Sequence, residues 1–215
     1  KQAKTYDQKQ KDKALKEAKE YNQDLIRLAV QLTDPFKAKK SSGETMAYNN
    51  ILNLDQSGVM GYLEIPCISV NLPIYHGTDA EILERGVGHL AASSLPIGGK
   101  STHSVLTGHT GLSSAKLFTD LTEIKKGDLF FINVLGQTLA YKVDQISVVR
   151  PGDTRKLQIV DGKDYVTLVT CTPYGINDHR LLVHGVRTKY AKKQEETIKP
   201  RNKNSQWMGT YKRAI

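Results

Sequence analysis

The stretch TLVTCTPYGINDHR, residues 167–180, holds two side chains that could carry out acyl transfer together. Cys171 offers a thiol, whose thiolate form attacks carbonyl carbon. Arg180 offers a guanidinium, which stays charged and can direct several donors at an oxyanion. Each also has a plainer interpretation, because a cysteine in a strand is usually an inert small hydrophobe and an arginine beside a turn is often only a surface charge.

A nucleophilic Cys171 also needs a base or a cation nearby, since a thiol with an ordinary pKa of about 8.5 is only a few per cent thiolate at neutral pH. His109 follows the apolar run HSVLTG much as Cys171 follows TLVT. Two strands that each end in a reactive group can present both at one rim, so His109 is the candidate base. Spacing alone leaves the other histidines open, although most occupy mid-strand or turn positions that favour a structural hydrogen bond: His76, His89, His103, His179 and His184.

The residues around Cys171 predict a β-hairpin. The run Tyr165–Thr170 is rich in Val, Thr and Leu, which favour strands. Turn-forming Pro, Gly, Asn and Asp come next, and a second apolar run, Leu181–Val186, follows them. We therefore expect a strand, an eight-residue loop at 172–179 and a second strand, with Cys171 and Arg180 facing each other across the mouth of the loop.

The rest of the chain from Val59 onward shows the alternation and turn signals of an all-β domain. Asp79–Arg85 predicts a short helix capped by Thr78, and LFFINVLGQTLAYKV predicts a hairpin that turns near Gly136. Few helices among many strands favour a β-barrel or sandwich. The candidate strands are Val59–Ile65, Leu72–Tyr75, Ser104–Gly108, Leu129–Val134, Thr138–Val149, Tyr165–Cys171 and Leu181–Lys189.

Cysteine use is sparse and limits the chemistry. The two cysteines cannot form a disulfide framework, and no Cys/His cluster has the spacing of a zinc site. Cys67 lies in LEIPCISV, a strand-like run, and is most simply a packed core residue. No acidic cluster argues for a calcium site, so we expect neither a metal nor a cofactor.

The N-terminal residues predict a long helix. Small and apolar residues recur there at steps of three and four: Ala14, Ala18, Tyr21, Leu25, Leu28, Ala29 and Leu32. Thr33-Asp34-Pro35 ends this helix, because proline lacks a backbone donor and its predecessor avoids helical geometry. A further short helix is predicted at Thr45–Ile51. We divide the chain into a helical extension (1–32), a connector (33–57), a β-domain (58–190) and a basic tail (191–215).

The net charge of +9 comes from the two ends of the chain. Residues 1–40 hold 11 Lys/Arg and 6 Asp/Glu, and residues 188–215 hold 8 and 2, whereas residues 41–187 hold 12 and 14. A nucleic-acid-binding domain would be expected to carry its basic stripe on the folded body, so we expect no nucleic-acid partner. Basic ends suit an anionic lipid surface, with solvated tails as the alternative.

The composition is that of a globular protein, with 39% hydrophobic and 25% charged residues. No run of apolar residues is long enough to span a bilayer. The final residues SQWMGTYKRAI nevertheless combine aromatic and cationic side chains, as membrane–water interfaces favour. We therefore expect membrane association through a transmembrane segment beyond residue 215.

Several of these motifs together resemble a sortase, and specifically a class C, pilin-polymerising sortase of Gram-positive bacteria. They are TLVTC with an arginine nine positions after the cysteine, LTGH upstream, and LPIYHG before that. The resemblance covers roughly residues 30–190. It implies Cys171 as the nucleophile, His109 as the catalytic histidine and Arg180 as the catalytic arginine. It also matches Asp34-Pro35-Phe36 to the class C lid motif, in which an aspartate and an aromatic residue plug the active site.

The fold implied by this resemblance is mainly β: an eight-stranded sortase-type barrel with N-terminal helices and a lid loop in residues 33–57. The implied activity is that of a cysteine transpeptidase. It cleaves an LPXTG-like sorting signal between Thr and Gly through a thioester, then transfers the pilin to a lysine amine of the next subunit. Arg180 would stabilise the oxyanion or hold the signal peptide. The implied location is the extracytoplasmic face of the cell membrane, with the full-length protein membrane-anchored.

Three other functions are weighed against this one. A housekeeping sortase that anchors proteins to the cell wall would share the same three residues and differ in the lid motif and the substrate. A non-catalytic β-module that binds anionic polymer through its tails predicts an unreactive Cys171. A papain-like peptidase is disfavoured, because its cysteine lies in a helix near the start of the mature chain, whereas Cys171 follows His109 and ends a strand.

Overall fold

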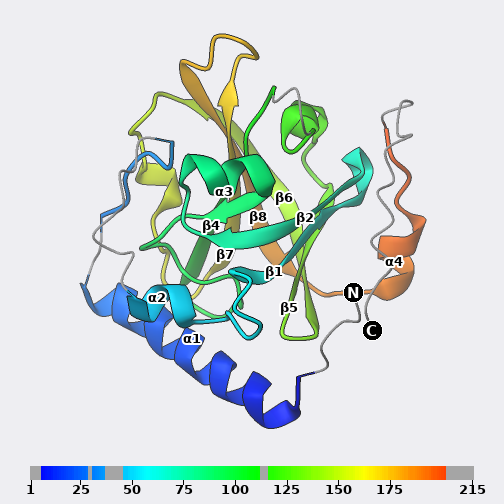
Figure 1. Ribbon diagram of the computed structural model, residues 1–215. Coiled ribbons are helices and arrows are strands. Elements are labelled where there is room, and N and C mark those ends of the chain that lie inside the picture. Colours follow the sequence, from blue (N-terminus) through cyan, green and yellow to red (C-terminus); the bar gives the residue numbers. More distant parts are fainter. Residues whose placement is uncertain (1–5, 29–30, 37–45, 112–115, 202–215) are drawn as a thin grey trace.

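The computed structural model describes residues 6–28, 31–36, 46–111 and 116–201. Within these ranges, eight strands close into one barrel in the order β1-β2-β3-β4-β7-β8-β6-β5 (Figure 1). The predicted mainly β, eight-stranded barrel with N-terminal helices is therefore confirmed. The strands are β1 (Val59–Ile65), β2 (Val70–His76), β3 (Val87–His89), β4 (Thr102–Thr107), β5 (Leu129–Val134), β6 (Gln137–Val149), β7 (Asp164–Thr172) and β8 (His179–Thr188).

The helices of the described residues are short except for the first. They are α1 (Gln8–Leu28), α2 (Met46–Asn50), α3 (Ala80–Arg85) and α4 (Lys192–Thr197), with 3-10 turns η1 (Pro66–Ile68), η2 (Thr119–Glu123) and η3 (Arg155–Leu157). None of the helices in this part of the chain combines the length and the hydropathy of a membrane span. The predicted interfacial segment at 205–215 lies outside the described residues.

The directions of the strands decide which strand ends lie at the same rim of the barrel. β4 and β7 are parallel, with Thr102 opposite Asp164 and Thr107 opposite Val169. Their C-terminal ends therefore reach the same rim. β8 is antiparallel to β7, so β8 begins at the rim where β7 ends. The end of β4 is thus brought to the β7–β8 hairpin, from which it is far apart in sequence.

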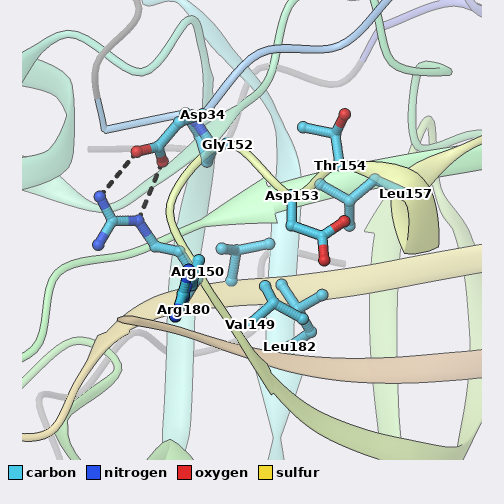
Figure 2. A pocket seen from close by; sticks show the side chains of 11 residues that line it. Asp34, Val149, Arg150, Gly152, Asp153, Thr154, Leu157, Arg180 and Leu182 are labelled. Atoms are coloured by element: carbon cyan, nitrogen blue, oxygen red, sulfur yellow. Dashed lines mark hydrogen bonds and ion pairs between the residues drawn. The ribbon is translucent and has the colours of Figure 1, made fainter. Parts of the chain in front are cut away.

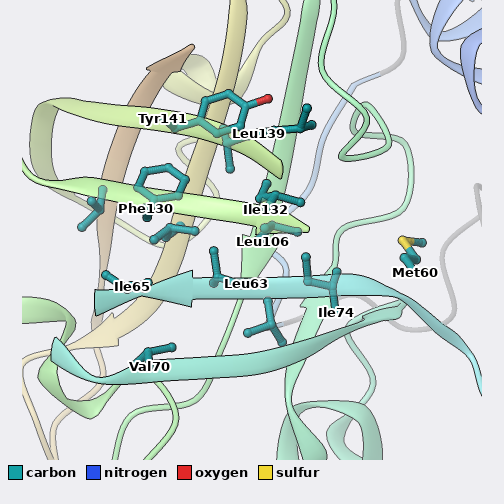
Figure 3. Close-up of a cluster of buried hydrophobic side chains, with 14 of the residues drawn as sticks. Met60, Leu63, Ile65, Val70, Ile74, Leu106, Phe130, Ile132, Leu139 and Tyr141 are labelled. Carbon is teal, nitrogen blue, oxygen red and sulfur yellow. The ribbon is translucent and has the colours of Figure 1, made fainter. Parts of the chain in front are cut away.

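The barrel interior is filled by aliphatic and aromatic side chains from alternate strand positions (Figure 3). Phe130 of β5 and Tyr141 of β6 stack with ring centroids 5.6 Å apart. Burying one large apolar side chain completely contributes about 1.5–3 kcal/mol, so a core of this kind makes a rigid frame for the rim. Members of the core drawn in Figure 3 include Met60, Leu63, Ile65, Val70, Ile74, Leu106, Phe130, Ile132, Leu139 and Tyr141.

Helix α1 packs against the barrel through its small residues. Ala14 and Ala18 are buried in the main core, where their short side chains let the helix approach closely. Asn22 fixes the contact, because its side-chain amide donates to the carbonyl of Leu95 and its Oδ1 accepts from the Leu95 amide at 2.7 Å. The helix is therefore anchored by packing and by a buried polar pair.

The predicted helix over residues 1–32 is too long at both ends. Residues 1–5 lie outside the described part, and α1 itself runs from Gln8 to Leu28. Leu28 was placed on the buried stripe but is 72% exposed. Leu32 has left the helix and packs with Phe36 against a second apolar cluster on the barrel. At Leu32 a partly buried contact with the barrel thus takes the place of the predicted helical pattern.

The predicted strands agree with the structure to within two residues at each end, and the hairpin turns at Leu135 and Gly136, which both have positive φ. Two details were wrong. The short strand β3 was missed, because three residues flanked by glycine carry little strand signal. The cap of α3 is Asp79 and not Thr78, since Asp79 is the extended residue whose carbonyl accepts from the first turn.

Candidate active site

Cys171 and Arg180 are paired across the β7–β8 hairpin. The two residues are direct partners in the antiparallel register, and Thr172 is opposite His179. The turn between the strands spans residues 173–178, shorter than the predicted loop because each strand continues further toward the rim. Cys171 is half-buried and Arg180 is buried. Their predicted position, facing each other across the loop mouth, is confirmed.

His109 lies two residues beyond the end of β4. The β4–β7 ladder is extended by the Gly108 amide, which donates to the Val169 carbonyl at 3.1 Å. The Thr170 hydroxyl in turn donates to the Gly108 carbonyl at 2.7 Å. Continuing the parallel register from Thr107 opposite Val169 brings His109 level with Cys171.

Gly108 also explains how the chain turns at His109. A Cβ at position 108 would lie 2.7 Å from a ring carbon of Phe118, so only glycine lets this fully buried ring pack against the backbone. The Phe118 amide donates to the His109 carbonyl at 2.9 Å. The histidine backbone is therefore held on both sides.

The two reactive residues of the hairpin share the outer face of the barrel with a small apolar cluster. Side chains alternate along a strand, so Cys171 lies on the same face as Val169, and Arg180 on the same face as Leu182. Val169 and Leu182 belong to a cluster outside the main core, with Leu90, Val105 and Leu157. Leu32, Phe36 and Val149 pack against its edge.

Asp34 forms a two-pronged ion pair with Arg180. Arg180 Nε donates to Asp34 Oδ1 at 2.9 Å and Nη2 donates to Oδ2 at 2.8 Å (Figure 2). The side chains of Arg180 and Asp34 are only 8% and 4% exposed. Arg180 Nη1 donates to the backbone carbonyls of Asn177 and His179. All three guanidinium nitrogens are thus engaged, and the Asp34 pair has the fork geometry that makes such pairs strong.

Phe36 covers the same site from the side. Its ring centroid lies 5.7 Å from that of His109, and Arg180 Cζ lies 4.9 Å from the ring centroid, a cation–π contact. The Phe36 ring therefore lies against both His109 and Arg180. The Asp34 carboxylate accepts from the Phe36 amide at 3.3 Å, which fixes the turn around Pro35.

The electrostatics of the candidate site favour the neutral forms of Cys171 and His109. Burial raises the pKa of the Cys171 thiol; Arg180 opposes this rise and Asp34 adds to it. Burial lowers the pKa of His109, and the carboxylate of Glu84 partly offsets that shift. A protonated thiol beside an unprotonated imidazole is the expected resting state, with a base available but not yet engaged.

A sortase domain model matches residues 63–188, more than half of the chain. The chain belongs to the sortase family. It is similar to sortase C-1 from Actinomyces oris, with 49% identity over 84% of this chain and 99% of that one and a TM-score of 0.79. Sortase C from Streptococcus pneumoniae is 44% identical, over 86% of this chain and 92% of that one, with a TM-score of 0.80. Sortase D of Bacillus subtilis is 29% identical over 179 residues, 82% of this chain and 83% of that protein.

The structural neighbours of this sortase at 42–49% identity include class C sortases from three species, in agreement with the predicted class. The protein is therefore a sortase-type enzyme whose fold and sequence lie close to the pilin-type members of the family.

The other histidines of the sortase have partners away from Cys171. His76 contacts the backbone carbonyls of Ile51 and Gly58, and His89 contacts Tyr48 and the Ser94 carbonyl. Both have their pKa lowered by burial, His89 to about 3. His184 pairs with Asp144, and His179 pairs with Asp178 beside the hairpin turn. His103 contacts Gln158 and Thr167.

Cys67 is in a different environment from Cys171. It is 2% exposed and lies in the 3-10 turn η1, not in a strand as predicted, because Pro66 interrupts the ladder between β1 and β2. Burial, reinforced by the charge of Asp128, raises its pKa to about 11. In the described part of the chain, no group of three or more His, Cys, Asp or Glu side chains is arranged to hold a metal ion.

Sequence reasoning missed two contributors to the site. Glu84 of α3 acts electrostatically on His109, although 25 residues separate them in the chain. The connection between β6 and β7 forms one wall: Val149, Arg150, Gly152, Asp153, Thr154 and Leu157 line a cavity with Asp34 and Arg180 (Figure 2). The cavity holds about 10 Å³, roughly room for one water, so the Asp34 segment fills most of this site. Neither element carries a local motif that points to the site.

Proposed function

We propose that this sortase is a cysteine transpeptidase that joins pilin subunits, with Cys171 as nucleophile, His109 as acid and base, and Arg180 as the positive group at the reacting carbonyl. The observation that carries the proposal is the arrangement at one rim. Cys171 and Arg180 are register partners, and His109 ends the parallel neighbour strand level with Cys171. The pilin class is supported by similarity to the S. pneumoniae sortase C, whose structure is described in terms of pilin substrate specificity.

The first half-reaction forms a thioester. His109 accepts the thiol proton, and Cys171 Sγ attacks the threonine carbonyl of an LPXTG-like sorting signal. Arg180 stabilises the resulting oxyanion or holds the peptide. The Thr–Gly bond then breaks, His109 gives its proton to the leaving glycine amine, and the C-terminal fragment departs. In the resting site the thiol is protonated and the imidazole is neutral, so the thiol proton can pass through His109 to the leaving amine in these steps.

The second half-reaction releases the thioester to a lysine. The ε-amine of a lysine on the next pilin attacks the thioester carbonyl, and His109 accepts a proton from that amine. The C–S bond breaks, Cys171 regains its proton, and an isopeptide bond joins the two subunits. No external energy source is required, because one acyl bond is exchanged for another.

We further propose that Asp34, Pro35 and Phe36 act as a lid that closes the site between turnovers. Asp34 occupies the guanidinium that the reaction needs, and the Phe36 ring covers His109 and Arg180. Pro35 fixes one backbone angle between them, so both side chains keep a set relative direction. Substrate must displace all three before Arg180 can reach a carbonyl oxygen.

The proposed location is the extracytoplasmic face of the Gram-positive cell membrane. The basic ends of the chain and the aromatic-basic residues near 215 support association with an anionic lipid surface. Pilin substrates that are assembled at the cell surface would meet the enzyme there.

The direct test mixes the protein with a candidate pilin that carries a sorting signal. A ladder of covalent multimers that survives boiling in detergent is expected, with mass spectra that show a threonine–lysine isopeptide bond. A pilin with its acceptor lysine changed to arginine is the matched control and should give a cleaved monomer only. Attachment to a cell-wall peptide amine in place of the ladder would indicate the housekeeping function instead.

The proposed lid can be tested by removing its two side chains. Replacing Asp34 and Phe36 with Ala should speed alkylation of Cys171 and cleavage of a short sorting peptide. If the lid is open about 1% of the time, releasing it completely should raise these rates roughly 100-fold, which is equivalent to about 2.7 kcal/mol. Removing Asp34 also removes one of the charges that raise the pKa of Cys171, so the pH profile of alkylation should shift to lower pH.

The matched control for this pair is Gln31→Ala with Thr33→Ala, at exposed positions of the same segment. Cys171 in this control should be alkylated at the same rate as in the parent protein, at identical pH and salt. Equal alkylation rates in the parent and in the Asp34→Ala, Phe36→Ala protein would exclude the lid and leave residues 33–36 as a helix terminator packed on the barrel.

A further inference from the structure

One buried histidine outside the proposed reacting group contacts the connection that forms a wall of the candidate active site. His103 lies on β4, opposite Tyr165 in the β4–β7 register. Cys171 is six residues further along β7, roughly 20 Å at strand spacing, so His103 cannot take part in the chemistry itself. It does contact the connection between β6 and β7, whose residues 150–157 face Asp34 and Arg180.

The contacts of His103 fix its protonation state. Nδ1 lies 2.9 Å from the backbone carbonyl of Gln158, which can only accept, so Nδ1 carries the proton. Nε2 lies 2.7 Å from the Thr167 hydroxyl, which then donates to it. Burial, with a smaller effect from His184, lowers the pKa of His103 to about 4. The ring is therefore neutral near pH 7 and directs a single donor at the connection.

The ring itself is held firmly. It makes edge contacts with Tyr165 and His184, with centroids 5.6 and 5.5 Å away. His103 is 1% exposed. A donor fixed by two rings and a hydroxyl gives the Gln158 carbonyl a definite position relative to the barrel.

The connection needs such an anchor at this point. Leu157, next to Gln158, is buried in the apolar cluster beneath the site, and its segment lines the cavity around Asp34 and Arg180. On the other side, Leu157, Gln158 and Ile159 border a pocket of about 310 Å³ among the described residues. The tethers at Ser101 to Asp161 and Thr102 to Lys163 lie further along, near the start of β7. The hydrogen bond to Gln158 therefore adds a polar tether directly beside Leu157, whose own burial holds it against the apolar cluster.

We propose that His103 is a positioning residue, whose hydrogen bond to Gln158 sets the β6–β7 connection as a wall for the substrate peptide. The wall role rests on the proposed transpeptidase function, whereas the effect on the connection does not. Loss of the bond should loosen residues 150–160 and weaken peptide binding, with the chemistry of Cys171 left intact. The net loss of one hydrogen bond typically changes an equilibrium by up to about tenfold, and the Gln158 bond is partly buried.

The test compares His103→Leu, which removes the donor, with His103→Asn, whose amide can sit where Nδ1 sits. Amide hydrogen exchange over residues 150–160 should be about tenfold faster in His103→Leu and close to the parent in His103→Asn. With a sorting peptide, KM should rise about tenfold in His103→Leu, with kcat changed much less. Lys156→Met is the matched control, because it removes only the exposed contact of the same connection with Ser147.

Unchanged exchange and unchanged KM in a folded His103→Leu protein would overturn the proposal, as would an equal loss in His103→Asn and His103→Leu. If His103→Leu does not fold, His103→Gln replaces it, since the longer amide reaches toward Thr167 and away from Gln158. If the parent cleaves no sorting peptide, the transpeptidase function fails, and hydrogen exchange still decides whether His103 holds the connection.

Discussion

Replacing Cys171 with Ala is expected to abolish both peptide cleavage and formation of the covalent pilin ladder. No other thiol can take its place, because Cys67 is 2% exposed and its pKa is raised to about 11. The acyl-enzyme cannot form without a sulfur at position 171, so the loss should be complete within detection and not a reduced rate. The measurement is peptide cleavage followed by chromatography, with multimers scored on a denaturing gel.

The matched control is Cys67→Ala, which removes the other thiol of the chain. It should retain nearly full activity, and a thiol-directed reagent should still label it once, at Cys171. The folded state of Cys171→Ala is checked by circular dichroism, since this position is half-buried at the end of β7. Residual transfer by a folded Cys171→Ala protein would mean that the thioester mechanism is wrong.

The second large effect concerns His109 and Arg180. Loss of a general acid and base typically costs about 10² to 10⁴ in rate, and loss of an oxyanion donor about 10² to 10³. The kcat/KM values of the His109→Ala and Arg180→Ala variants should fall by these factors. Arg180→Ala also leaves the buried Asp34 carboxylate without its partner, so its stability should be measured alongside, and Arg180→Ala with Asp34→Ala separates the two effects.

His179→Ala is the matched control for both variants. His179 is next to Arg180 in sequence, but its ring is partly exposed and pairs with Asp178. Its replacement should leave turnover close to that of the parent. Near-parent turnover in His109→Ala, combined with a large loss in His76→Ala or His179→Ala, would show that the base is a different histidine.

The hairpin and most strands could be predicted because their signals are local. Val, Thr and Leu in the run before Cys171, and Pro, Gly, Asn and Asp after it, define two strands and a turn within residues 164–188. The pairing of Cys171 with Arg180 follows from that hairpin. Gly136 similarly marks the β5–β6 turn, where its positive φ suits glycine.

What could not be predicted depends on contacts between distant segments. Leu32, predicted on the helical stripe, instead lies partly buried against the barrel. The position of Phe36 depends on which partners surround it after folding, so its contacts with His109 and Arg180 have no local signal. The β6–β7 wall is irregular in sequence, and only the closed barrel brings it to the reactive face.

The register of β7 has a consequence for how this enzyme can change over evolutionary time. β7 is held by β4 on one side, and β8 is held by β6 on the other, so the alignment of Cys171 with Arg180 does not depend on the turn that joins them. A shift of one residue along either ladder would rotate the thiol or the guanidinium to the opposite face, and selection would remove it at once. The tip of the turn at 173–178 escapes that constraint, whereas the Asn177 carbonyl near its end accepts from Arg180. Tyr174 and Ile176 at its tip are 70% and 68% exposed, and insertions there would extend the loop outward. The proposed catalytic frame can therefore be fitted with new recognition surfaces by lengthening or rewriting the tip of the turn, without shifting the ladders that align Cys171 with Arg180.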